Sequence, residues 1–389
     1  MSRTIKKKRK KIAIILATSP NFGGGHQYAV LIAECLAQNS VNNYELVAIC
    51  CNPFWKRWCM KNKIKYIDKM FPDSAQNFFY LFPFFNRLYN RYMTPMGKIL
   101  RKEKVDILFS AQQLFYIPDY GLKIIAPVHD LMHRYESSFP EVQEEYDKRE
   151  AILESYASYA YMILTDSKMG KRQFEETYLM ERSRKPYVVS LPFIVPQHIY
   201  EVREEEIAVP EKYVFYPAQF WKHKNHMNLV KAIHILKGKI ADIHLVLAGS
   251  GRNSGREIKD YIQRNRLEKN ITILGFVSDE NITYLYKHAV GMIMPSYFGP
   301  TNLPPLEAMA LGCPVAVSDK YAMPEQVGDA GLLFNPDSPE EIADCIERLW
   351  TDNNLREEMK VCGYKRIRLW NRDKFCRRLM KIVDKIEVY

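Results

Sequence analysis

The sequence predicts an α/β protein made of two domains, each with a parallel β-sheet covered by helices on both faces. Its 389 residues exceed the length at which a single hydrophobic core stops growing, so two domains are expected. Short apolar runs alternate with segments of helical periodicity along most of the chain. The alternation restarts after a charged stretch, VREEEI at residues 202–207, which places the domain boundary near residue 200.

The apolar runs of the first half have the length and composition of strands buried in a parallel sheet. They are residues 11–17, 45–50, 105–110, 122–128 and 161–165. A glycine-rich loop and a helical pattern over residues 26–38 follow the first run. We therefore expect residues 12–200 to form the first of two doubly wound domains.

The second half repeats this pattern of strands and helices. Its apolar runs are residues 213–216, 243–248, 271–274, 291–294 and 314–317. Helical patterns cover residues 227–236 and 370–385. We expect a second domain over residues 201–370 and a C-terminal helix within 371–389. Ligands of open α/β sheets bind at the carboxyl ends of the strands, so the chemistry should lie in the loops there.

The net charge of +11 is concentrated near the N-terminus, where residues 3–11 carry seven lysines and arginines. We interpret residues 1–11 as a basic tail that is simply solvated or attracted to an anionic membrane surface, with nucleic-acid binding as a third alternative. No basic helix or stacking-aromatic module accompanies this run, so we expect no nucleic acid partner. No apolar run has the length of a membrane span or a signal-peptide core. We expect a cytoplasmic protein, with peripheral attachment to the membrane left open.

The eight cysteines show no spacing typical of a metal site, and a chain of this length needs no disulfides to stabilise its core. We therefore expect reduced thiols.

Residues 78–85, FFYLFPFF, are dense in aromatic side chains. Packing in the core is one interpretation. An exposed apolar face that binds a lipid or hydrophobic acceptor is the other.

Two loops of the chain offer groups that suit phosphate. In PNFGGGH, residues 20–26, consecutive glycines allow close approach of the backbone at the start of a helix. In WKHKNH, residues 221–226, Lys224 could neutralise a departing diphosphate. Each loop has a simpler interpretation as well, a tight turn in the first case and a solvated basic loop in the second.

A third loop joins a strand to a helix and reads PSYFGPTNLPPLEAMA over residues 295–310. Prolines suit the first turn of a helix because the N–H groups there lack internal partners. We expect Glu307 in this same first turn, where a carboxylate is favoured by the helix dipole or could bind the hydroxyls of a ribose.

The third loop resembles the signature of the retaining glycosyltransferases of family 4, which have the GT-B architecture of two Rossmann-like domains facing a central cleft. Further segments follow in the order of that family: YPAQFWKHKNH at 216–226, VLAGSG at 246–251, LGFV at 274–277 and GDAGLLFNP at 328–336. In the first half, the glycines at 23–25 and VHDL at 128–131 are also similar. The form FGPTNLPP resembles a subgroup found among enzymes of polysaccharide biosynthesis.

The resemblance implies roles for individual residues. The catalytic set would be His129 beside the transferred sugar, Lys224 at the diphosphate and Glu307 at the donor ribose. The other residues expected to bind the donor are Gly24, Gly25, Gln219, Gly299, Pro300, Thr301, Asn302 and Leu303.

Two positions depart from the family pattern. Gly299 stands where the family has a glutamate, and Thr301 or Asn302 could replace that contact with the sugar. Gln219 stands where the family has an arginine, and Lys222 could restore the charge.

The resemblance further implies transfer of a sugar from a nucleotide-sugar donor to a glycan or lipid-linked acceptor, with retention of configuration. It implies no metal ion and no cofactor besides the nucleotide-sugar co-substrate. The final helix of such proteins crosses back to the first domain. Three alternatives stay open: a non-catalytic nucleotide-sugar or glycan-binding protein of the same fold, a nucleotide-sugar epimerase, and a nucleic-acid binder acting through the basic tail.

Overall fold

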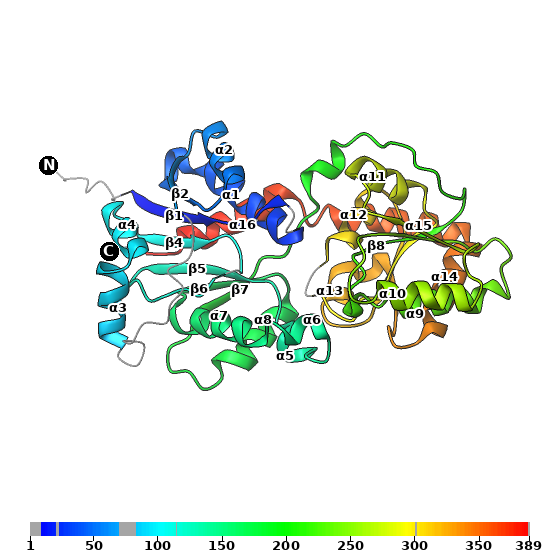
Figure 1. Ribbon diagram of the computed structural model, residues 1–389. Helices are drawn as coiled ribbons and strands as arrows, with labels where there is room; N and C mark the ends of the chain where they lie inside the picture. Colours follow the sequence, from blue (N-terminus) through cyan, green and yellow to red (C-terminus); the bar gives the residue numbers. More distant parts are fainter. Residues whose placement is uncertain (1–8, 21–22, 70–82, 114, 300–301, 388–389) are drawn as a thin grey trace. The chain divides into compact units, whose positions relative to one another are not determined.

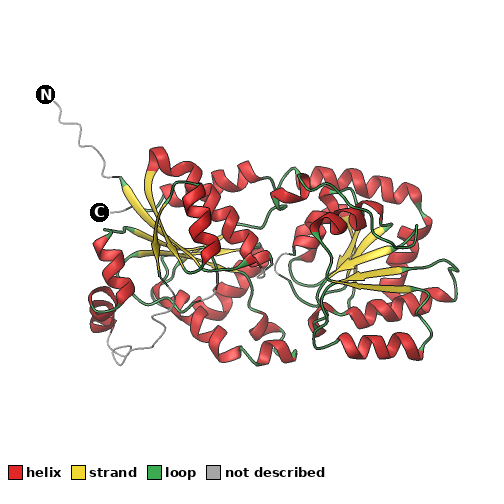
Figure 2. Ribbon diagram, turned by 45° about the horizontal axis from the view of Figure 1, so that its top comes forward, coloured by secondary structure: helices red, strands yellow, loops and turns green. Residues whose placement is uncertain are grey.

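The protein divides into two compact units in a computed structural model, which describes residues 9–20, 23–69, 83–113, 115–299 and 302–387. Unit 1 consists of Met1–Leu131, Tyr146–Pro192 and Asp373–Tyr389. Unit 2 consists of Met132–Glu145 and Phe193–Arg372. Each unit contains one parallel sheet with helices on both faces, as the sequence predicts (Figures 1 and 2).

The sheet of unit 1 has seven strands in the order β3-β2-β1-β4-β5-β6-β7, all paired in parallel. The central strands are almost completely buried because helices cover both of their faces. The strands are β1 (Lys10–Leu16), β2 (Tyr44–Cys50), β3 (Lys65–Asp68), β4 (Ile107–Ser110), β5 (Lys123–Val128), β6 (Met162–Thr165) and β7 (Tyr187–Ser190).

The helices of unit 1 begin where the sequence supplies capping groups. Asn52, Thr94 and Ser167 each accept a backbone N–H from the first turn of α2, α4 and α8. The helices are α1 (Gly24–Asn43), α2 (Pro53–Lys61), α3 (Pro83–Tyr92), α4 (Pro95–Lys102), α7 (Tyr146–Tyr159), α8 (Lys168–Phe174) with its π-helical extension (Glu175–Leu179), and α16 (Arg372–Asp384).

The sheet of unit 2 has six parallel strands in the order β10-β9-β8-β11-β12-β13. They are β8 (Val214–Pro217), β9 (Leu245–Ala248), β10 (Ile271–Gly275), β11 (Gly291–Met294), β12 (Val315–Ser318) and β13 (Gly331–Phe334). Both sheets follow the doubly wound order, in which the strand order reverses beside the first strand of the unit. The carboxyl ends of β8 and β11, which lie side by side, therefore mark the expected ligand edge.

The helices of unit 2 cover its sheet on both sides (Figure 2). The main ones are α9 (His226–Lys237), α10 (Gly255–Arg264), α11 (Asp279–His288), α12 (Leu303–Ala310), α13 (Met323–Val327), α14 (Pro339–Thr351) and α15 (Asn353–Ile367). Three 3₁₀ turns complete the unit: η4 (Gln197–Tyr200), η5 (Lys222–Lys224) and η6 (Gly328–Ala330).

The domain limits differ from those expected from the sequence. The segment Met132–Glu145, with short helices α5 (Met132–Tyr135) and α6 (Pro140–Gln143), packs in unit 2 although it lies between two strands of unit 1. The later boundary lies at Pro192 and Phe193 rather than near residue 200. The last segment, with most of α16, returns to unit 1.

The basic tail is shorter than residues 1–11, because β1 begins at Lys10. Lys11 forms salt bridges with Glu45 at 2.6 Å and Glu103 at 3.0 Å, and Lys10 donates to the Val383 carbonyl at 3.2 Å. These two lysines therefore belong to the fold of unit 1. Residues 1–8 lie outside the described part of the chain.

The expectation that all thiols are reduced is wrong for one pair. Cys35 in α1 and Cys376 in α16 form a disulfide within unit 1, with a Cα–Cα distance of 5.3 Å. A sequence separation of 341 residues hides this pair from any search for spacing motifs. The other six cysteines, all within the described residues, do not form disulfides.

Among the described helices, none combines the length and the apolar character needed to cross a membrane.

Candidate functional site

The loop after β8 holds Lys224 at the carboxyl edge of the sheet of unit 2. The loop ends in the short turn η5 and then in Asn225, whose φ of 56° is left-handed. The Asn225 amide donates to the carbonyls of Pro295 at 3.0 Å and Pro336 at 2.8 Å, and the Tyr216 hydroxyl donates to the Lys224 carbonyl at 3.0 Å. These bonds from buried side chains fix the backbone on which the Lys224 ammonium is carried.

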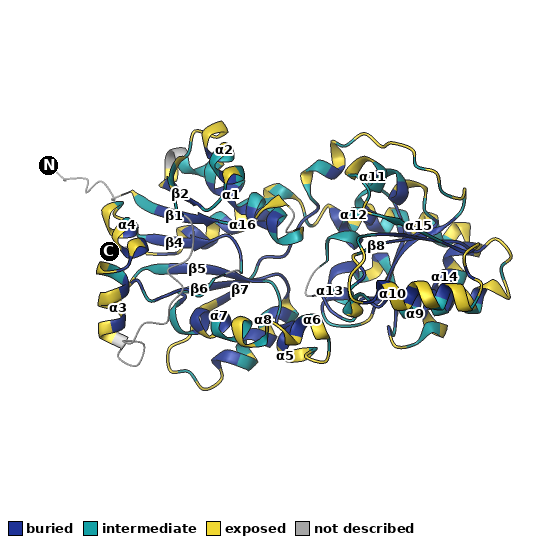
Figure 3. Cartoon of the chain, viewed as in Figure 1, coloured by how far each residue is buried: buried dark blue, intermediate teal, exposed yellow. Residues whose placement is uncertain are grey.

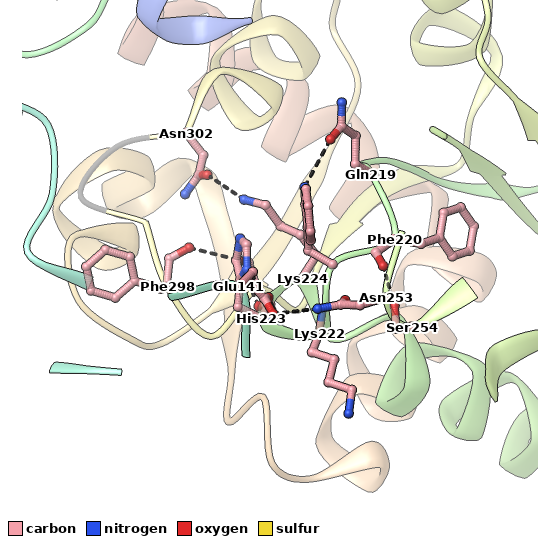
Figure 4. A network of polar contacts seen from close by, with 12 residues as sticks. Glu141, Gln219, Phe220, Lys222, His223, Lys224, Asn253, Ser254, Phe298 and Asn302 are labelled. Atoms are coloured by element: carbon pink, nitrogen blue, oxygen red, sulfur yellow. Dashed lines mark hydrogen bonds and ion pairs between the residues drawn. The ribbon is translucent and has the colours of Figure 1, made fainter. Parts of the chain in front are cut away.

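The Lys224 ammonium lies 3.5 Å from Oδ1 of Asn302, the residue at the N-cap position of α12 (Figure 4). The Asn302 backbone is held in turn, because its N–H donates to Gln326 Oε1 at 3.0 Å. A Cβ atom at Gly299 would lie 1.8 Å from the Asn302 amide nitrogen. The carboxamide of Asn302 therefore occupies the space into which a side chain at position 299 would extend.

The start of α12 offers few free amide groups. Leu303 is its first residue, and the prolines at 304 and 305 carry no N–H. Helix N-terminal N–H groups attract anions, but here Leu303 is the single donor among the first three positions. A phosphate at this edge would depend mainly on side-chain cations.

Glu307 lies in the second turn of α12 rather than in the first as expected, because the helix already begins at Leu303, and it is half-buried. Its Oε2 accepts the hydroxyl of the fully buried Tyr286 at 3.0 Å. Burial raises the pKa of Glu307 to about 7, although the Tyr286 hydroxyl opposes this effect. The carboxylate is thus poised to change charge near neutral pH, and a ligand that donates hydrogen bonds would favour its ionised form.

A second carboxylate, Glu141 of α6, fixes the turn that carries Lys224 (Figure 4). Its Oε1 lies 2.7 Å from Nδ1 of His223 and accepts the His223 N–H at 3.2 Å. Its Oε2 accepts the Asn253 amide at 2.6 Å, while Asn253 Oδ1 accepts the Lys222 N–H at 3.0 Å. Burial opposes ionisation of Glu141, but these hydrogen bonds prevail and lower its pKa below the ordinary value.

Gln219 lies in the same loop, and its partners are Trp221 and Arg252 rather than Lys222. Its Oε1 accepts the Trp221 ring N–H at 3.0 Å and Arg252 Nε at 3.2 Å. The Arg252 guanidinium also lies over the Trp221 ring, 5.1 Å from the centroid. The cation beside position 219 is therefore Arg252 from the loop after β9.

His129 lies at the carboxyl end of β5 in unit 1, and its partner is Asp166 rather than the adjacent Asp130. The distance from Nδ1 to Asp166 Oδ2 is 3.0 Å, whereas Asp130 pairs with Arg149. Burial raises the pKa of Asp166 to about 6. Burial disfavours the imidazolium form of His129, but the Asp166 carboxylate outweighs burial and raises the pKa of His129.

The glycine loop lies at the same edge of the sheet of unit 1. Gly23, with φ of 59°, precedes α1, and Gly24 and Gly25 form the first turn of that helix. One turn on, Tyr28 packs edge-on against His129 with ring centroids 5.1 Å apart. Unit 1 thus brings Gly24 and Gly25 to the edge that carries His129.

Unit 2 brings Lys224, Asn302 and Gly299 together and places Gln219 in the same loop as Lys224. Pro300 and Thr301 lie outside the described residues.

The residues that sequence reasoning missed are Glu141, Asp166 and Arg252. Their partners lie 82, 37 and 33 positions away, so only the folded chain reveals them. His226, which flanks Lys224, stacks on Phe220 at 4.3 Å between centroids and has a structural part in the loop.

Residues 200–366 match the family model described as glycosyl transferases group 1. The matched residues all lie in unit 2, and the two sheets are those of the GT-B fold. One similar structure is that of Alr3699/HepE from Anabaena in complex with UDP and glucose. It has a TM-score of 0.70 and 13% identity, covering 97% of this chain and 100% of that chain.

Two curated relatives are mannosyltransferases by name. O-antigen chain mannosyltransferase B of Escherichia coli is 33% identical over 37% of this chain, which spans 38% of the length of that relative. The human alpha-1,3/1,6-mannosyltransferase ALG2 is 24% identical, with 74% of this chain and 75% of that protein covered.

Proposed function

We propose that the chain is a glycosyltransferase that moves a sugar from a nucleoside-diphosphate sugar to a glycan or lipid-linked acceptor, with retention of configuration and without a metal ion. The observation that carries this proposal is the position of Lys224 at the carboxyl edge of a doubly wound sheet. Its ammonium contacts Asn302, the residue at the N-cap position of α12. The relatives named as mannosyltransferases support sugar transfer, and the UDP named in the HepE structure supports a nucleotide-linked donor.

The chemistry asks the protein to stabilise negative charge as the nucleoside diphosphate departs. The Lys224 ammonium suits this task, because hydrogen bonds fix the backbone that carries it and Asn302 Oδ1 accepts from the ammonium. An interaction of this kind is worth about 2.7–4 kcal/mol in comparable anion-stabilising sites. Glu307 would accept the ribose hydroxyls as a carboxylate, and His129, oriented by Asp166, would lie beside the sugar.

The first test is a thermal-shift panel of UDP, GDP, dTDP, ADP and CMP, on wild type, Lys224→Ala and Glu307→Ala. A ligand at one hundred times its dissociation constant adds about 2.7 kcal/mol, which such an assay detects. Stabilisation of wild type by one diphosphate, lost in both variants, supports the donor site. No response to any nucleotide contradicts the proposal.

Activity distinguishes a transferase from a non-catalytic binder of the same fold. Because two relatives are mannosyltransferases by name, a mannose donor carrying the base found in the panel is the first sugar to test. Transfer or slow hydrolysis that disappears in Lys224→Ala supports a transferase. Tight donor binding without any turnover, even with a range of glycan acceptors, would establish the binder instead. Release of an altered nucleotide sugar without acceptor would indicate an epimerase.

The exposed face of α3 supports a lipid-linked acceptor at an anionic membrane. Much of α3 is exposed (Figure 3), and Phe84 and Phe85 are 68% and 58% exposed. Arg87, which pairs with Asp119 at 2.9 Å, and Arg91 lie on the same helix. Aromatic and basic side chains together are typical of helices that lie in a membrane interface. The residues 70–82 of the aromatic stretch lie outside the described part of the chain.

Liposome sedimentation tests this membrane proposal. We expect wild type to bind vesicles that contain phosphatidylserine at low salt, to release as salt rises, and to bind more weakly after Phe84→Ser with Phe85→Ser. Met180→Ser removes an equally exposed apolar side chain elsewhere in unit 1 and is the matched control. Absence of binding at low salt would refute membrane attachment and leave donor binding unaffected.

A further inference from the structure

The loop that carries Lys224 lacks a cation at position 219, where Gln219 stands. Lys222 does not fill this place. Its side chain is exposed and points away from Gln219 and Lys224 (Figure 4). Its backbone N–H is the part that is held, by Asn253 Oδ1 at 3.0 Å.

Arg252 fills the place from the neighbouring loop, between β9 and α10. Its Nε donates to Gln219 Oε1 at 3.2 Å, and its guanidinium stacks on Trp221. Trp221 donates to the same oxygen at 3.0 Å, so one carboxamide oxygen orients both side chains. Within the described residues, no carboxylate forms a salt bridge with Arg252. The terminal nitrogens of the guanidinium therefore keep their hydrogen-bonding capacity for another acceptor.

The backbone of this arrangement is rigid because the two loops are bonded to each other. Phe220 N–H donates to the Ser250 carbonyl at 3.2 Å, and Ser254 N–H donates to the Phe220 carbonyl at 3.0 Å. Gly249 has a φ of 147°, and a Cβ atom there would lie 2.1 Å from the Ala218 carbonyl oxygen. Only glycine permits this close approach, which sets the position of Arg252 relative to Gln219 and Trp221.

We propose that Arg252 is the second cation of the donor diphosphate site, which binds the phosphates together with Lys224. This inference rests on the proposed function, because it names a further residue of the same nucleotide site. A guanidinium presents two parallel N–H groups to phosphate oxygens, and the Nε bond to Gln219 leaves the outer pair of nitrogens available. Glutamine at position 219 suits this role, because an arginine there would place a second cation against Arg252.

The test measures dissociation constants by isothermal titration calorimetry, for the nucleoside diphosphate that stabilises wild type and for the matching nucleoside. Arg252→Ala should weaken the diphosphate about tenfold, the effect expected for one charge-assisted contact at an exposed site. The nucleoside should bind equally to wild type and variant. Arg256→Ala, an exposed arginine four positions further along, is the matched control and should change neither constant.

A charge swap gives a second measurement. Arg252→Gln combined with Gln219→Arg should recover most of the affinity that Arg252→Gln loses, because it moves the cation to the other side of the same hydrogen bond. Lys222→Ala tests the rival position and should have less than a twofold effect.

Three results overturn the inference. The first is a diphosphate affinity of Arg252→Ala equal to that of Arg256→Ala. The second is an equal loss of nucleoside and diphosphate binding in Arg252→Ala. The third is a large loss of diphosphate affinity in Lys222→Ala alone. Failure of wild type to bind any nucleoside diphosphate would instead refute the proposed function itself, so the two failures are distinguishable.

Discussion

The Glu141 carboxylate lies 2.7 Å from Nδ1 of His223 and accepts the backbone N–H of the same residue. Glu141 comes from a segment that interrupts unit 1 in the sequence but packs in unit 2. The Glu141 carboxylate therefore contacts His223, the residue that precedes Lys224. The turn of the proposed diphosphate site is shaped by a carboxylate that lies outside the segment matched by the family model.

Replacing Glu141 should loosen this turn. Glu141→Ala leaves the His223 N–H and the Asn253 amide without their acceptor, which should cost about 1–3 kcal/mol of unfolding free energy. Urea unfolding measures the loss, and the affinity for nucleoside diphosphate should fall with it. Glu144→Ala, an exposed neighbour, is the control. Unchanged stability and affinity in Glu141→Ala would show that the turn holds its shape unaided.

The contact between Glu141 and His223 should also make the free energy of unfolding depend on pH in the acid range. The pKa of Glu141 is lowered in the folded protein, so its stabilisation is complete above the ordinary value of 4.5 and is lost as the pH falls through the folded value. The stability difference between wild type and Glu141→Gln should therefore shrink below pH 4.5. A difference that is constant from pH 3 to pH 7 would exclude an ionised Glu141.

Nucleotide affinity should rise with pH through the titration of Glu307. Its pKa in the free protein is about 7, and ribose hydroxyls donate to the ionised carboxylate, so binding below pH 7 must also remove a proton. Calorimetric titrations from pH 5.5 to pH 8.5 should show this rise in wild type. Glu307→Gln, which cannot titrate, should bind more weakly and show a flat profile. Identical profiles would remove Glu307 from the ribose site.

The same residue should limit the stability of the free protein at high pH. Because folding raises the pKa of Glu307 from 4.5 to about 7, its contribution is complete below pH 4.5 and is lost as the pH rises through 7. Glu307→Gln should therefore be more stable than wild type above pH 7, by up to about 3 kcal/mol. Chemical unfolding at pH 5 and pH 8 checks the sign of this difference.

Gly299 and Asn302 should act as a pair. An alanine at 299 would force the Asn302 carboxamide to turn away, since the new Cβ lies 1.8 Å from its nitrogen. Loss of the contact with Lys224 should weaken diphosphate binding about fivefold, the size of one hydrogen bond near 1 kcal/mol. In an Asn302→Ala background, Gly299→Ala should have no further effect. Additive losses in this double-mutant cycle would contradict the coupling.

Asp166 should act by orienting His129. Asp166→Asn keeps the shape of the side chain but removes the charge that favours one ring orientation and tautomer. We expect kcat to fall about a hundredfold, as misplacement of a reacting group commonly does, while KM changes little. Asp130→Asn, which touches Arg149 instead, is the control and should retain most activity. Equal losses in both variants would assign the effect to general destabilisation.

The sequence predicts most of the fold because buried parallel strands are recognisable as short, strongly apolar runs. All ten predicted strands are present within a few residues of their expected limits. Three were missed: β3, a half-exposed edge strand reading KYID, β7, reading YVVS after a charged stretch, and β13. Periodicity is weak in four-residue strands whose faces are not both buried.

The polar partners of the site were not predictable in the same way. Position 219 could be recognised as lacking a cation from the motif, but the choice of Arg252 over Lys222 depends on the direction of two side chains. Asp130 is adjacent to His129 in sequence, yet β6 places Asp166 closer. The packing of Met132–Glu145 in unit 2 likewise depends on tertiary contacts, because its two helices are only four residues long.

The bridge between Cys35 and Cys376 closes a covalent ring that includes every residue of unit 2. The chain enters the long segment of unit 2 at Phe193 and returns to unit 1 after Arg372, and both crossings lie between the two cysteines. A protease cut in any loop of unit 2 would open the ring without releasing a fragment until the bridge is reduced. The oxidised protein would then migrate as one species after nicking, and the two parts would separate only in a reducing gel.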